Sequence, residues 1–333
     1  MRKLQFLAAL SMLTLSYTAN AAVGPTFTEW NDQQVNEVNR FKLHTHFFAY
    51  ENVDKALKGD MTLSSNYLSL HGDWKFNWVE NADQRPTDFY KTTFDDSSWK
   101  SFPVPGIWEL NGYGDPEYLN IGFAWRGNHE INPSKVPVKD NHVGSYRRII
   151  EIPAGWNGKQ VIAHFGSVTS NIYLWVNGQY VGYTEDSKIG AEFDVTPYLK
   201  PGKNLIAFQT FRWCDGSYNE DQDFWRLSGV ARQSYLFARD KNVHIENIKI
   251  TPDLKNNYQD GEALINVDVK GEPIIDFELL NANGVRIVKS ESNFKKRTNG
   301  TVRFVLRNVK KWTAETPYLH CEEQSAQYHW CVS

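Results

Sequence analysis

Two β-rich runs meet at an Asn-Gly dipeptide in residues 172–183, and this feature constrains the fold more than any other. Asn177 and Gly178 form the preferred sequence of a type I′ turn, because both central residues of that turn need a positive φ. Similar β-rich runs occur at residues 74–78, 146–152, 161–165 and 205–211. Many short strands separated by regular turns predict an antiparallel sandwich or jelly roll rather than a parallel α/β sheet.

A second pattern of strands begins near residue 240. Residues 243–250 alternate apolar and polar side chains, and β-rich runs follow at residues 263–269, 275–280 and 302–306. The dipeptides Asn283-Gly284 and Asn299-Gly300 are typical of the turns between such strands. The spacing predicts a smaller, immunoglobulin-like sandwich over residues 241–319, after a jelly-roll domain over residues 67–240. The fold class is therefore all-β, with two domains.

The N-terminus has the pattern of a cleavable signal peptide. Met1-Arg2-Lys3 is basic, residues 4–15 are largely apolar, and Ala19-Asn20-Ala21 supplies the small residues that signal peptidase requires. We therefore expect residues 1–21 to be removed and the protein to be secreted or periplasmic. Residues 22–66 are interpreted as an N-terminal segment with short elements, including a helix that begins within residues 52–56.

Charge and cysteine content exclude several classes of protein. A formal net charge of −3 is too small to indicate binding to nucleic acid or to an anionic membrane surface. Three cysteines cannot form a dense disulfide framework. After the signal peptide, no segment is long and apolar enough to predict a membrane-spanning helix.

Residues 212–226 contain most of the chemistry in the chain, with four carboxylates and two tryptophans. The carboxylates could act as an acid/base pair of a glycosidase, ligate a hard cation, or bind sugar hydroxyls beside a stacked tryptophan. The alternative is a structural loop whose acids pair with Arg212, Arg226 and Arg232. Spacing alone favours the structural loop and leaves the other interpretations open.

The same loop closely resembles a signature of the β-galactosidase branch of glycoside hydrolase family 2. The matching sequence is Arg212-Trp213-Cys214-Asp215-Gly216-Ser217-Tyr218-Asn219-Glu220-Asp221-Gln222-Asp223-Phe224-Trp225-Arg226. Further motifs of the family occur in the same order, and the resemblance covers about residues 36–319. They include Asn39-Arg40, Gly72-Asp73-Trp74-Lys75-Phe76, Val104-Pro105-Gly106-Ile107-Trp108, Pro116-Glu117-Tyr118-Leu119-Asn120, Val176-Asn177-Gly178, Asp186-Ser187, Glu192-Phe193-Asp194 and Trp312-Thr313-Ala314-Glu315-Thr316-Pro317-Tyr318-Leu319.

The resemblance implies an architecture and a small set of site residues. The family's jelly roll and immunoglobulin-like sandwich precede a TIM barrel that carries two catalytic glutamates. By resemblance, Asp215 contacts the 6-hydroxyl region of galactose and helps to hold a sodium ion, and Asn120 reaches the same subsite. Glu220, Asp221 and Asp223 are expected to fix the loop and its contacts to the barrel.

The barrel itself is expected to be absent. Residues 241–333 are far fewer than the roughly 250 residues of a TIM barrel, and they have the pattern of a sandwich. The catalytic glutamates and the magnesium ligands of the family therefore have no counterpart, and no histidine spacing suggests a replacement metal site. Residues 320–333 show no alternating apolar pattern. We interpret them as a non-family tail, typical of out-of-frame translation, with genuine divergence as the alternative. The resemblance implies two further strands after Leu319, so the immunoglobulin-like sandwich of residues 241–319 is expected to be incomplete.

Three hypotheses about function follow from these observations. The first is a part of a β-galactosidase that hydrolyses terminal β-galactosides and is inactive alone. The second is a secreted carbohydrate-binding module without catalysis. The third is one subunit of a split glycosidase whose barrel is encoded separately. Within the family, β-glucuronidase and β-mannosidase are the alternative specificities, while the sequence does not indicate an oligomeric state.

Overall fold

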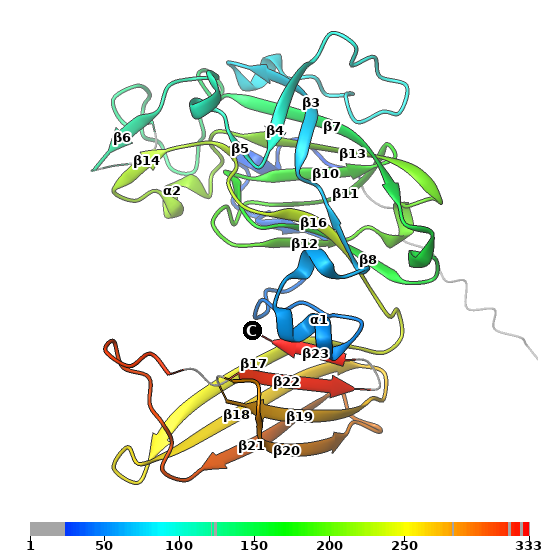
Figure 1. The fold of residues 1–333 in the computed structure, drawn as a ribbon. Helices are drawn as coiled ribbons and strands as arrows, with labels where there is room; N and C mark the ends of the chain where they lie inside the picture. The colour runs from blue at the N-terminus through cyan, green and yellow to red at the C-terminus, as the bar shows by residue number, and fades with distance from the viewer. Residues whose placement is uncertain are drawn as a thin grey trace, which may run out of the picture.

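The computed structural model describes residues 24–120, 122, 125–281, 283–318, 321–326 and 329–332. The predicted signal peptide lies outside these residues. The chain forms two β-sheet domains, drawn one above the other in Figure 1. The prediction of an all-β fold with a jelly-roll-like sandwich and a second, smaller sandwich is confirmed.

The first domain packs a seven-stranded sheet against a four-stranded sheet, and all their strand pairs are antiparallel. In spatial order, the larger sheet contains β1 (Glu37–Val38), β11 (Gln179–Thr184), β10 (Ile172–Val176), β13 (Gly202–Phe211), β7 (Val143–Ile152), β3 (Gly72–Val79) and β4 (Lys100–Val104). The smaller sheet contains β12 (Ala191–Asp194), β8 (Gln160–Phe165), β16 (Ser234–Arg239) and β2 (Tyr67–Ser69). The first domain also contains two short sheets. One pairs β15 (Gly229–Val230) with β5 (Gly106–Ile107) and β9 (Val168–Thr169), and the other pairs β14 (Phe224–Arg226) with β6 (Glu117–Leu119).

The hairpin predicted from Asn-Gly is present. Strands β10 and β11 pair up to Val176 and Gln179, which leaves only Asn177 and Gly178 in the turn. Both turn residues have a positive φ, 52° and 83°. This is the geometry that a type I′ turn requires.

The larger sheet is buried on both faces by aromatic side chains. One face packs against the smaller sheet through a core that includes Trp74, Trp108 and Phe208. The other face is covered by a second cluster, to which Trp30 contributes from a short 3₁₀ helix and Trp125 from a loop. The high aromatic content of the chain is thus largely used in packing.

The second domain packs a three-stranded sheet against a four-stranded sheet around its own apolar core. The first sheet contains β17 (His244–Lys255), β18 (Asp260–Lys270) and β21 (Asn299–Leu306). The second contains β20 (Arg286–Asn293), β19 (Ile274–Leu280), β22 (Cys321–Ala326) and β23 (His329–Val332). Asn299-Gly300, predicted as a turn, is instead the start of β21, where Asn299 pairs with Asp268.

The C-terminal residues also differ from the prediction. Residues 320–333 were expected to lie outside the sandwich, yet β22 pairs with β19, and β23 pairs with β22. The physical reason is that backbone pairing needs only N–H and C=O groups, so a segment without alternating side chains can complete an open sheet edge. The second sheet therefore gains two strands that the side-chain pattern did not predict.

Removing residues 319–333 is expected to expose the edge of β19. The N–H and C=O groups of β19 that now bond to β22 would lose their partners, while those that face β20 would keep them. Hydrogen exchange followed by mass spectrometry should then show at least about tenfold faster exchange in residues 274–280. Strand β18, which lies in the other sheet, serves as the internal control. Unchanged protection of β19 would contradict the role assigned to β22.

The N-terminal segment contacts both domains. It contains η1 (Glu29–Asn31), β1, α1 (Val53–Lys58) and η2 (Met61–Leu63). Helix α1 begins within the predicted residues 52–56, and the Asn52 side chain caps it. Within it, Phe47 and Ala49 pack against the core of the second domain, whereas Phe48 and Tyr50 pack with Tyr235 of the first. Alternate side chains of one extended segment thus contact opposite domains.

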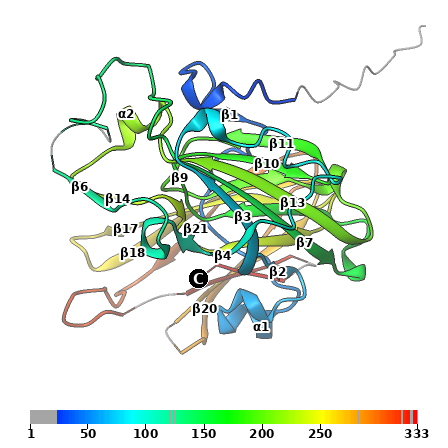
Figure 2. The same ribbon diagram turned by 90° about the horizontal axis from the view of Figure 1, so that it is seen from above.

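The remaining helical elements are short. The four remaining 3₁₀ turns are η3 (Ala82–Gln84), η4 (Glu109–Asn111), η5 (Ala154–Trp156) and η6 (Thr196–Tyr198). The second α-helix, α2 (Ser217–Glu220), lies beside β14 and β6 at one edge of the first domain (Figure 2). In the part of the chain that the structure describes, no helix has the length and apolar character needed to cross a membrane.

Candidate functional site

The signature loop follows directly from the end of β13. Trp213 and Cys214 are buried, so they anchor the loop in the core, and α2 then turns the chain back towards β14. Gly216 begins this turn where a side chain would not fit, because a Cβ there would lie 2.8 Å from Oε2 of Glu185. The loop is therefore packed tightly against the end of β11.

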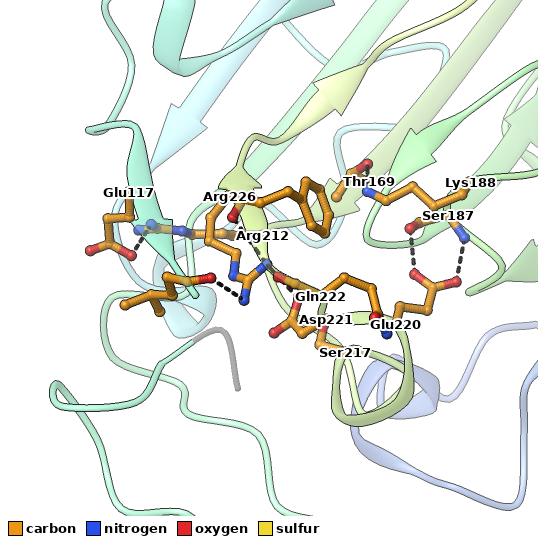
Figure 3. A network of polar contacts seen from close by, with 12 residues as sticks. Glu117, Thr169, Ser187, Lys188, Arg212, Ser217, Glu220, Asp221, Gln222 and Arg226 are labelled. Atoms are coloured by element: carbon orange, nitrogen blue, oxygen red, sulfur yellow. Dashed lines mark hydrogen bonds and ion pairs between the residues drawn. The ribbon is translucent and has the colours of Figure 1, made fainter. Parts of the chain in front are cut away.

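Three of the four acids in the loop contact residues that hold the loop in place, and Figure 3 shows two of them, Glu220 and Asp221. Glu220 accepts hydrogen bonds from the backbone N–H of Ser187, at 2.9 Å, and from its hydroxyl. Asp221 lies 3.8 Å from Arg226, and Asp223 accepts a hydrogen bond from the hydroxyl of Tyr118. These contacts are the ones expected of loop-fixing residues, and they do not bring these three acids together as a catalytic pair.

Two arginines tie the loop to β6. Arg212 forms a 2.8 Å ion pair with Glu117 at the start of β6. Arg226 donates to the carbonyl of Gln222 at 2.6 Å, within the loop, and to the carbonyl of Leu119 at 3.5 Å. Arg232, the third arginine considered as a partner, instead donates to the carbonyl of Lys188 at 2.8 Å.

Asn120, predicted to reach the galactose subsite, follows the last residue of β6 and is exposed. Beside it, Tyr118 and Trp225 form an edge-on aromatic pair across β6 and β14, with ring centroids 5.6 Å apart. About half of each ring is exposed, 53% for Tyr118 and 51% for Trp225. Among the described residues, no hydrogen bond joins Asn120 to Asp215.

Asp215 lies at the inner side of the loop and is only 7% exposed. Its backbone N–H donates to the carbonyl of Trp30 at 3.0 Å, which fixes it against the N-terminal segment. Its Oδ1 atom is buried and has no hydrogen-bond partner in the described part of the chain. Burial raises the pKa of this carboxyl above its usual value, although a hydrogen bond from Glu185 acts in the opposite direction.

Glu185 is the residue at this site that sequence reasoning missed. Its carboxylate oxygens accept hydrogen bonds from the hydroxyl of Tyr183, at 2.7 Å, and from the backbone N–H of Gly216, at 3.1 Å. Burial, together with the nearby Asp215 carboxylate, raises the pKa of Glu185 to about 9. At neutral pH the Glu185 carboxyl therefore holds a proton, directly beside the carboxyl of Asp215.

Asp215 carries the oxygen atom that is expected to help hold a sodium ion. A sodium ion prefers oxygen ligands, as hard cations do, and Oδ1 of Asp215 is one carboxylate oxygen without another partner. The described residues contain no group of three or more histidine, cysteine, aspartate or glutamate side chains that could hold a metal ion. Asp215 thus offers one oxygen ligand of the kind that a sodium ion takes.

A small cavity lies beneath the loop, bounded by Arg212, Glu220 and Arg226 (Figure 3). Its volume is about 30 Å³, which is enough for a water molecule but not for a sugar ring. The fold and the loop together define a two-domain β-sheet module with a charged loop at one edge.

Family models match both domains. The model described as "Glycosyl hydrolases family 2, sugar binding domain" matches residues 67–240, and the model "Glycosyl hydrolases family 2" matches residues 243–321. The first match alone covers more than half of the chain. The chain therefore belongs to glycosyl hydrolase family 2.

Curated relatives agree with this assignment. A protein from Priestia megaterium named "Beta-galactosidase" is 38% identical over 91% of this chain, and one from Halalkalibacterium halodurans with the same name is 36% identical over 87%. The chain spans only 30% and 28% of the lengths of these two relatives. A β-glycosidase from Bacteroides vulgatus has the same fold over 78% of this chain, with a TM-score of 0.60 and 22% sequence identity.

Proposed function

We propose that this chain is the sugar-contacting, non-catalytic N-terminal part of a β-galactosidase-type glycoside hydrolase, which removes terminal β-galactose from β-galactosides. On this proposal Asp215 contacts galactose and supplies one oxygen ligand to a sodium ion, and Asn120 contributes to the same subsite. Cleavage would require catalytic carboxylates that these two domains do not provide.

The main support for this function is that the buried Oδ1 atom of Asp215 has no hydrogen-bond partner among the described residues. A buried acceptor without a hydrogen bond costs roughly 1–3 kcal/mol, and more when it is charged. A cation or a sugar hydroxyl at this atom would offset that cost. Glu185, which is protonated at neutral pH, adds no second negative charge beside Asp215.

Galactose binding by the chain alone is expected to be weak, with a dissociation constant of about 1 mM or higher, because only one wall of the subsite is present. NMR titration with methyl β-D-galactoside in sodium buffer measures this affinity. Asp215→Ala should weaken binding at least about fivefold. Asp223→Ala, which removes an exposed acid of the same loop, is the matched control and should leave it unchanged. Micromolar binding, or equal effects of the two variants, would contradict the proposal.

We also propose that the protein is exported. The N-terminal pattern predicts cleavage after Ala21, so the mature protein should begin at Ala22. Mass spectrometry of protein recovered from the periplasm or the medium tests this prediction. A retained Met1 in exported protein, or recovery only from the cytoplasm, would show that residues 1–21 do not act as a cleaved signal peptide.

A further inference from the structure

A second, larger cleft lies outside the signature loop and shares no lining residue with the cavity beneath it. Its volume is about 790 Å³, within the roughly 300–1,000 Å³ of small-molecule sites. The cleft is bounded by the N-terminal segment near residues 41–46, by β8 and β12 of the smaller sheet, and by residues 231–233. It thus lies on the side of the first domain where the N-terminal segment passes towards the second domain.

At one wall of the cleft, a glutamate is held between two histidines. Glu192 accepts a hydrogen bond from Nε2 of His44 at 2.9 Å and from Nδ1 of His164 at 2.8 Å. Burial alone would raise the pKa of Glu192, but these two hydrogen bonds outweigh it and lower the pKa to about 2. The carboxylate is therefore ionised at neutral pH and fixes the orientation of both imidazole rings.

This arrangement prepares His164 to accept a hydrogen bond. Because its Nδ1 lies against Glu192, Nε2 is the ring nitrogen that remains for a ligand. The described part of the chain gives Nε2 no hydrogen-bond partner, and the ring lines the cleft. His46, whose ring centroid is 5.8 Å from that of His164, and Phe41 add ring faces to the same cleft.

The cleft also carries positive charge. Lys42 and Arg232 line it, and both are exposed. Arg232 uses one N–H group on the carbonyl of Lys188, and a guanidinium has four more. The negative charge of Glu192 is already engaged by His44 and His164. A ligand entering the cleft would therefore meet cations, one lone-pair acceptor and apolar ring faces.

We propose that this cleft binds an acidic saccharide, that is, a sugar ring that carries a carboxylate. The carboxylate would pair with Arg232 and Lys42, since an arginine fork suits a carboxylate. A ring hydroxyl would donate to Nε2 of His164, and the apolar face of the sugar would lie on Phe41 or His46. The site needs no residue of the Asp215 loop, so it is independent of the function proposed above.

Isothermal titration calorimetry with D-galacturonate and D-galactose, at pH 7 and low salt, tests this proposal. D-galacturonate should bind at low millimolar affinity or better. In Asp215→Ala, which lacks the galactose contact proposed above, D-galactose should bind at least tenfold more weakly than D-galacturonate. Raising the salt from 50 to 300 mM should weaken D-galacturonate binding, because exposed charges are screened.

Variants locate the site. Arg232→Ala and His164→Gln should each weaken D-galacturonate binding at least fivefold, and exposed Arg232 can be replaced without disturbing the core. Arg307→Ala, which removes an exposed arginine of the second domain, is the matched control for charge. Asp215→Ala should not change D-galacturonate binding. No binding, equal affinity of Asp215→Ala for the two sugars, or binding that survives Arg232→Ala and His164→Gln would overturn the proposal.

Discussion

Replacing Gly144 by alanine is expected to destabilise the first domain by about 3 kcal/mol. Gly144 lies in β7 and is buried. A Cβ there would lie 2.4 Å from the indole of Trp108 and 2.9 Å from the ring of Phe76. Trp108 is fully buried and is hydrogen-bonded to the hydroxyl of Tyr146, so its ring cannot move aside without breaking that bond.

The matched control is Gly155→Ala. A Cβ at Gly155 would have no atom within 4 Å, so this substitution should be neutral or stabilise by up to about 1 kcal/mol, since alanine restricts the unfolded chain more than glycine does. Urea denaturation followed by tryptophan fluorescence measures both variants. Equal midpoints for Gly144→Ala and the unsubstituted protein would show that β7 and Trp108 do not pack as described.

The second large effect is expected from Glu185→Gln, and it depends on pH. The pKa of Glu185 is about 9 in the folded protein, against an ordinary value of 4.5. Between these values the folded state holds a proton that the unfolded state releases, so stability falls as pH rises. The slope is about 1.4 kcal/mol for each pH unit. A glutamine cannot ionise, and it therefore removes this loss.

The stability of the variant relative to the unsubstituted protein should thus increase steadily from pH 5 to pH 8.5. Glutamine loses one of the two acceptor positions used by Tyr183 and Gly216, but that cost does not change with pH. Thermal denaturation in potassium buffer, without sodium that could bind Asp215, gives the comparison. If the difference in stability between Glu185→Gln and the unsubstituted protein were the same at every pH, Glu185 would be ionised at neutral pH and would not carry the proton assigned to it.

The sequence predicted most reliably where local chemistry decides the structure. Asn177-Gly178 specifies its turn through backbone conformation alone, and Asn52 caps the first turn of α1 through its own side chain. Asn299-Gly300 was predicted wrongly for a related reason. The chain turns before it, within residues 294–298, and strand pairing with β18 extends Asn299 and Gly300. Tertiary pairing there outweighs the local preference.

The polar clusters could not be predicted, because they join residues distant in sequence. His164 and Glu192 meet only since β8 and β12 are neighbours, and His44 comes from the N-terminal segment. The sequence around Glu185 does not indicate that this side chain is buried, because its position is set by packing against Gly216. By contrast, the resemblance of the signature loop singled out Asp215 as a candidate from the sequence alone, and the structure places this residue deeper than an exposed binding residue.

The rate at which the purified mature chain hydrolyses a chromogenic β-galactoside tests directly whether these two domains are non-catalytic. The three outer acids of the signature loop are held by Ser187, Arg226 and Tyr118, and Asp215 lies beside the protonated Glu185. The loop therefore gives its acids structural partners and does not pair them as the acid and nucleophile of a retaining glycosidase. We predict a rate equal to that of buffer alone. Turnover that copurifies with the chain and disappears in Asp215→Ala would contradict the account.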